Sequence, residues 1–135
     1  MNSNGIVVSN LVKDEELKFL KKVGKEYGIN VCVLSTKHTA IGNLIVCNDK
    51  GGVISKFISK KEKKAIEDCL DVECEYGKIA GLDIVGSCSV ATNKGCLVHR
   101  DCSNKEIEML EEVLKVNCDI GTINFGSPFI SSGVI

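Results

Sequence analysis

Cys96 and His99, in the segment GCLVHR, stand three positions apart in the sequence. A cysteine becomes a nucleophile when a neighbouring group, often a histidine, lowers the pKa of its thiol. Both residues lie on or just after a short expected strand, where side chains at an odd separation point to opposite faces. We therefore expect no catalytic dyad, no catalytic residue, no cofactor and no small-molecule substrate.

Three other cysteines occupy equivalent places on expected strands: Cys32, Cys74 and Cys118. Thiolates bind zinc, so three thiols brought together could form a metal site. The alternative is that each is a small buried strand residue, which is the usual role of a free cysteine. The chain has 8 cysteines but no CxxC pair, and the N-terminal MNSNGIVVSN is not a signal peptide. We expect reduced, buried thiols without a disulfide or a metal.

An internal repeat positions these residues. The segments SNGIVV (3–8), DKGGVI (49–54) and NKGCLV (93–98) align, with their glycines 46 and 44 residues apart. Each is followed by a charged segment with helical spacing of apolar residues. Ser59 with Glu62, and Ser103 with Glu106, have the spacing of a capping box. The first helix has Lys13 at the cap position and therefore a weaker start.

Each expected helix leads into a short strand: INVCVLS, LDVECEYG and LKVNCDIG. An apolar strand opened by a glycine comes next, at 41–48 and 85–93, and a third such start, SGVI, occupies 132–135. Asn48 and Asn93 precede glycines, as in tight hairpin turns. One unit is thus a β-β-α-β module of roughly 45 residues.

The repeat predicts an α/β fold in which neighbouring modules share a core. We expect one domain over residues 1–135, with modules at 1–40 (partial), 41–84 and 85–131, and the start of another at 132–135. This is an open arc of about three modules, and we interpret it as part of a larger protein. Its unpaired edges would favour self-association.

The charge is balanced, with 17 basic and 18 acidic residues, which favours a protein partner over a dedicated nucleic-acid binder. The lysine run Lys56, Lys60, Lys61, Lys63 and Lys64 indicates a solvated helix face. His38 is isolated in a polar segment and is expected at the surface. No stretch approaches ~18 apolar residues, so we expect no membrane partner and a cytoplasmic location.

Several spaced motifs carry a family resemblance: IGNLIVCND, LDVECEYG, IVGSCSVATNKGCLVH and IGTINFGSP. Together they are similar to the initiation factor 6 family of archaea and eukaryotes. The resemblance implies a pentein-type β/α propeller of five modules around an axis. This chain would correspond to most of the second module, all of the third and fourth, and the first residues of the fifth.

The resemblance also implies a function. Members of this family bind the large ribosomal subunit near the sarcin–ricin loop, largely through a ribosomal protein. They prevent premature joining of the small subunit, act in subunit maturation in eukaryotes, and catalyse nothing. Two alternatives are a Cys-dependent pentein hydrolase or amidinotransferase-like enzyme, and an inactive structural fragment.

The candidate ribosome-binding residues are Gly42, Asn43, Gly86 and Ser87, at the glycine-led strand starts. Symmetry of the ring would place them, with the Gly133-Val134 start, on one face. By the same resemblance, Asn43 matches a position that is similar to part of the family's ribosome-facing surface. The alternative is that the glycines serve only in tight turns and that Asn43 caps a backbone group.

Overall fold

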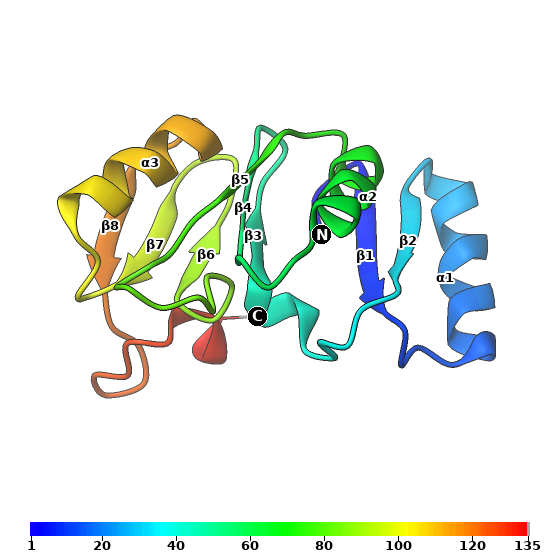
Figure 1. Ribbon diagram of the computed structural model, residues 1–135, viewed down its shortest axis with the longest axis horizontal. Helices are drawn as coiled ribbons and strands as arrows, with labels where there is room; N and C mark the ends of the chain where they lie inside the picture. The colour runs from blue at the N-terminus through cyan, green and yellow to red at the C-terminus, as the bar shows by residue number, and fades with distance from the viewer. Residues whose placement is uncertain (135) are drawn as a thin grey trace.

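Three similar units lie side by side along the long axis of the molecule (Figure 1). The structure is a computed structural model and describes residues 1–134. Unit 1 contains β1 (Gly5–Ser9), α1 (Asp14–Tyr27) and β2 (Asn30–Leu34). Unit 2 contains β3 (Ile45–Cys47), β4 (Gly52–Ile54), α2 (Lys60–Leu70) and β5 (Cys74–Tyr76). Unit 3 contains β6 (Ser89–Ala91), β7 (Cys96–His99), α3 (Asn104–Leu114) and β8 (Cys118–Gly121).

The predicted β-β-α-β order is confirmed in units 2 and 3. In each, the first two strands pair antiparallel and the third pairs parallel to the second, across the helix. Unit 1 has one parallel pair, β1 with β2. The described residues thus form a mixed α/β structure with three separate small sheets that do not close into a ring.

The two predicted capping boxes are present at the starts of α2 and α3. The Ser59 hydroxyl accepts the Glu62 N–H, and Glu62 accepts the Ser59 N–H at 2.7 Å. Ser103 and Glu106 repeat this arrangement. At α1 only half of it forms, because Lys13 donates its N–H to Glu16 but has no side-chain oxygen. Local sequence therefore determines where α2 and α3 begin.

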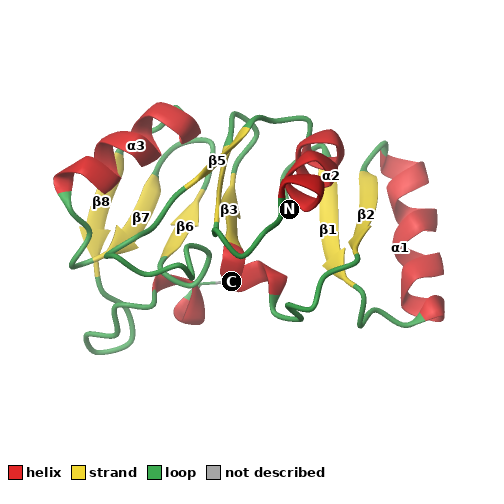
Figure 2. Ribbon diagram, viewed as in Figure 1, coloured by secondary structure: helices red, strands yellow, loops and turns green. Residues whose placement is uncertain are grey.

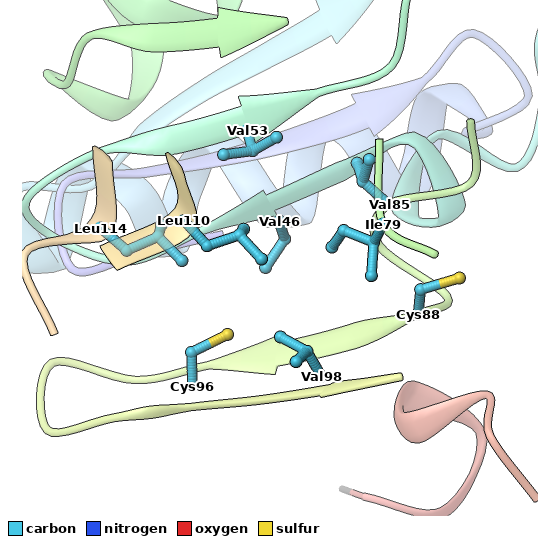
Figure 3. Packing of buried hydrophobic residues seen from close by; sticks show 9 residues of the cluster. All are labelled: Val46, Val53, Ile79, Val85, Cys88, Cys96, Val98, Leu110 and Leu114. Carbon is cyan, nitrogen blue, oxygen red and sulfur yellow. The ribbon is translucent and has the colours of Figure 1, made fainter. Parts of the chain in front are cut away.

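The apolar core lies between the units as well as within them. Figure 3 shows Cys96 and Val98 of β7 pointing towards Val46 of unit 2, with Leu110 of α3 beside them. A second cluster joins Leu34 of unit 1 to the inner side of α2. Each unit therefore completes the core of its neighbour, as the repeat predicts.

The glycine-led strand starts differ from the prediction in detail. Gly42 lies in a 3-10 helix, Ile41–Leu44, and the strand begins only after it. A matching 3-10 helix, Ile130–Gly133, follows unit 3. Figure 2 shows both short helices at the edge of the molecule opposite the hairpin turns. We call this edge, formed by residues 36–44, 55–58, 79–88 and 122–134, the turn edge.

Candidate functional site

The 3-10 helix Ile41–Leu44 presents two of the predicted site residues to solvent. Its first and last residues, Ile41 and Leu44, are buried and anchor it, whereas Gly42 and Asn43 are exposed. The backbone carbonyl of Asn43 accepts a hydrogen bond from the Gly86 N–H at 2.9 Å. The turn is therefore held by its neighbour while the Asn43 side chain points outward.

Gly86, the second predicted glycine, is buried. A Cβ atom at this position would overlap the carbonyl oxygen of Gly42 and crowd that of Ile45. Only glycine allows the two turns to approach so closely. Gly86 therefore positions the turn of unit 2 against that of unit 3, and its own surface is not available to a partner.

Ser87 is half-buried, and its backbone carbonyl bonds to the next turn as the Asn43 carbonyl does. It accepts hydrogen bonds from the backbone N–H and the hydroxyl of Ser131, both at 3.3 Å. Equivalent backbone hydrogen bonds therefore join successive turns and form one ladder: Gly86 to Asn43, and Ser131 to Ser87. The third turn aligns at Ile130-Ser131-Ser132, two residues before the Gly133 alignment that the sequence suggested, because its 3-10 helix begins at Ile130 as the earlier one begins at Ile41.

Within residues 1–134, the Asn43 side chain makes no hydrogen bond and caps no backbone group. A shallow depression of about 380 Å³ lies beside it, with Lys37, His38 and Phe57 among its lining residues. His38 is half-buried there rather than freely exposed. This part of the turn edge combines an amide, a cation and an aromatic ring.

The opposite edge carries a second ladder, which the turn prediction captured only in part. Asn48 does form a hairpin turn, accepting the N–H groups of Lys50 and Gly51. Its buried amide also donates to the carbonyls of Thr92 at 3.1 Å and Leu114 at 2.8 Å in unit 3. Asn2 makes the equivalent bonds to Asn48 and to Leu70, the last residue of α2.

Asn93 is exposed and belongs to an outer layer of this ladder. Its side-chain Oδ1 atom accepts the Asp49 N–H, and its side-chain amide donates to the Asp49 carboxylate. Asp49 in turn accepts the Ser3 N–H at 2.8 Å. The sequence does contain a signal for these bridges: two consecutive residues with hydrogen-bonding side chains stand at the start of every hairpin turn.

The three equivalent thiols remain in separate units. Cys118 is in register with Cys96, Cys74 lies across Gly52 from Cys47, and Cys32 contacts Cys69. Burial raises the pKa of Cys74 to about 12 and also raises the pKa values of Cys32 and Cys118. Residues 1–134 contain no group of three or more His, Cys, Asp or Glu side chains placed to hold a metal ion.

Cys96 and His99 do not act on each other. Burial raises the pKa of the Cys96 thiol, which lies in the core beside Cys118. His99 accepts the Asp101 N–H at its Nδ1 atom, and its ring packs edge-on against Phe129 at 5.8 Å. A neutral thiol without a basic partner is a poor nucleophile.

The predicted basic helix face is largely present. On α2, Lys63 and Lys64 form ion pairs with Glu67 and Asp68, while Lys60 and Lys61 are exposed. Lys56 lies before the helix and pairs with Asp83 at 2.9 Å. Within residues 1–134, the helices are too short or too polar to cross a lipid bilayer.

The described residues therefore form a mixed α/β structure of three similar units, and the candidate site is an exposed edge. The sequence model of the eIF-6 family matches residues 1–135. The chain is 54% identical over 135 residues to translation initiation factor 6 of Nitrosopumilus maritimus and 53% identical to that of Cenarchaeum symbiosum. It is 50% identical to the factor of Pyrococcus furiosus over 88 residues, which is 64% of this chain. The chain belongs to the eIF-6 family.

These matches cover only part of the relatives. The chain spans 60% of the Nitrosopumilus and Cenarchaeum proteins, and the shorter match spans 39% of the Pyrococcus protein. The relatives are named as translation initiation factors, which is not an enzymatic function.

Proposed function

We propose that this chain is part of a factor that binds the large ribosomal subunit and prevents premature joining of the small subunit. The observation that carries the proposal is the exposed Asn43, whose amide has no hydrogen-bond partner among the described residues. Two buried residues and the Gly86 N–H hold its turn in place. A side chain on a backbone that is already fixed loses less conformational freedom on binding, which favours its use as an interface anchor.

The mechanism in this proposal is steric occlusion. The factor covers a surface of the large subunit, near the sarcin–ricin loop and largely on a ribosomal protein, that the small subunit needs for joining. Such a role requires a broad, rigid surface and no chemical step. It takes place in the cytoplasm, where ribosomal subunits join.

We also propose that the units belong to a pentein-type propeller, with module boundaries near residues 41, 85 and 132. The repeated bonds at both edges support it, because each unit contacts the next through equivalent atoms. A constant relation between successive units generates a ring when its rotation closes.

Replacement of Asn43 by lysine tests the ribosome-binding proposal. An exposed turn substitution alters stability by ~0.5 kcal/mol or less. Loss of an interface anchor costs ~2 kcal/mol or more in binding, roughly thirtyfold in affinity. We expect Asn43→Lys to reduce co-sedimentation with purified archaeal large subunits while the melting temperature stays close to that of the parent.

Asn117→Lys is the matched control, because Asn117 is exposed at the opposite edge and the charge change is the same. It should sediment like the parent. Unchanged sedimentation of the Asn43 variant would remove this residue from the interface.

A further inference from the structure

A groove of about 580 Å³ opens on the turn edge between units 1 and 2. One wall is the chain leaving β2, and the other is the first half of α2. Six of its lining residues carry its chemistry: Leu34, Thr36, Lys37, His38, Phe57 and Lys61. Lys37, His38 and Phe57 also line the depression beside Asn43, so the groove continues to the proposed ribosome-binding turn.

Two aromatic rings contribute to the exposed apolar surface of this groove, together with Val33. The ring of Phe57 is 5.5 Å from that of His38, with an angle of 33° between their planes. Phe57 remains 46% exposed, although the Lys56 ammonium group approaches its ring at 5.5 Å. Exposed aromatic side chains beside cations are the groups on which nucleobases stack in single-strand binding proteins.

The charged groups of the groove favour an anionic occupant. Lys37 and Lys61 are exposed and form no ion pair within residues 1–134. The carboxylate in the groove, Glu62, is engaged in capping α2, where it accepts the Ser59 N–H at 2.7 Å.

The cavity between units 2 and 3 provides an internal contrast. It lies between β5 of unit 2 and the second half of α3, away from the turn edge. Three carboxylates line it, Glu73, Glu75 and Glu112, together with two lysines. The two cavities therefore present opposite charge to a partner, and only the first lies on the turn edge.

We propose that the groove between β2 and α2 binds a segment of single-stranded RNA. The phosphates interact with Lys37 and Lys61, and a base packs on the exposed surface of Phe57 and His38. This inference rests on the proposed function, because ribosomal RNA is the abundant polyanion of the large subunit. Aromatic stacking and a cationic wall are the two features by which proteins hold single strands without reading their sequence.

The test measures binding of a fluorescein-labelled oligouridylate of about 10 nucleotides to the 135-residue chain, as a function of salt. We expect Lys37→Glu and Lys61→Glu each to weaken binding at least about fivefold and to lower the salt dependence by about one ion. Phe57→Ala should weaken binding about tenfold, and Phe57→Tyr should restore most of it.

Lys105→Glu is the control, because Lys105 is the second residue of α3 as Lys61 is of α2, and both are exposed. It should change binding less than about twofold. Equal losses of RNA affinity in Lys61→Glu and Lys105→Glu would overturn the proposal. So would tighter binding of a polyglutamate peptide than of the RNA, since the occupant would then be an acidic polypeptide.

The experiments distinguish a failure of the RNA site from a failure of the proposed ribosome-binding turn. If Asn43→Lys abolishes co-sedimentation with large subunits but the groove variants bind RNA like the parent, the RNA site is wrong and the ribosome-binding turn stands. If RNA binding follows the groove but Asn43→Lys sediments normally, the position of the ribosome interface is wrong.

Discussion

Asn48 shows at the scale of one residue how the units are joined. Its side-chain Oδ1 atom accepts two backbone N–H groups within its own turn, and its side-chain amide donates to two carbonyls of unit 3. All the hydrogen-bonding capacity of the side chain is used in a buried place. Buried networks of this kind are costly to break, because the remaining partners stay out of water.

Replacement of Asn48 by aspartate should therefore destabilise the chain strongly. The shape is unchanged, but both donors are lost and a carboxylate faces the Thr92 and Leu114 carbonyls. We expect a loss of about 3 kcal/mol in the free energy of unfolding, measured by urea denaturation. The same change at the half-buried Asn2 should cost less. A loss below ~1 kcal/mol at Asn48 would contradict the importance of this bridge.

The cysteines provide a second prediction at this scale. Burial raises the pKa of Cys74 to about 12 and that of Cys88 to about 11. At pH 8 their thiolate fractions are lower than that of an ordinary thiol by about two to three orders of magnitude. We expect iodoacetamide to modify them far more slowly in the native chain than in urea, as followed by peptide mass spectrometry. Rapid native alkylation of Cys96 would revive the enzyme alternative.

At the scale of the elements, the helix starts connect local sequence to the contacts between units. Glu106 accepts the N–H of Ser103 at 2.8 Å in its own capping box. Its other carboxylate oxygen accepts the N–H of Gly81, in the loop that leads from unit 2 to unit 3, at 2.9 Å. One side chain thus caps α3 and holds the connecting loop against it.

The pH dependence of stability should reveal this carboxylate. Burial raises the pKa of Glu106, but the hydrogen bonds from Gly81 and Ser103 outweigh burial and hold it below its usual value. A lowered folded-state pKa means that the stabilisation is complete above the unfolded pKa of ~4.3 and disappears as pH falls through the folded value.

Glu106→Gln should accordingly cost about 1 kcal/mol at pH 7, and the cost should shrink as the pH falls below the unfolded pKa, in thermal melts across the acidic range. Glu108→Gln, on an exposed position of the same helix, serves as the control. If the stability difference between the parent and Glu106→Gln stays constant with pH, the ionised form of Glu106 is not the stabilising one.

At the scale of the whole molecule, glycines allow successive units to approach closely. A Cβ atom at Gly5 would overlap the Cys69 carbonyl oxygen, and one at Gly51 would overlap that of Val113. Both carbonyls belong to the helix of the following unit. At the equivalent Gly95 the nearest atom is the Asn117 oxygen at 3.6 Å, an ordinary contact.

Gly51→Ala and Gly95→Ala therefore form a matched pair. Overpacking against a backbone atom should cost Gly51→Ala about 3 kcal/mol, because units 2 and 3 must separate. Gly95→Ala should change stability by less than ~1 kcal/mol. Chemical denaturation of both variants measures the difference, and equal stabilities would mean that the units are not packed as closely as described.

The order of elements in each unit and the helix starts could be predicted from the sequence, because their causes are local. A capping box requires residues three positions apart, and a hairpin turn requires asparagine and glycine within four residues. Neighbouring residues in the chain satisfy these conditions without knowledge of the rest of the fold. The exposed turn at Asn43 follows only in part: Ile41 and Leu44 anchor it locally, but the sequence predicts neither its 3-10 helix nor the hydrogen bond from Gly86.

The contacts between units depend on the tertiary structure alone. The close approach of Gly86 to Gly42, the Ser131–Ser87 hydrogen bond and the Asn48 bridge each join residues that are 44 or more positions apart. The groove at Phe57 likewise exists only because α2 packs beside the end of β2. These features follow from how one unit docks on the next, and docking geometry is the sum of many weak, non-local contacts that no short sequence pattern encodes.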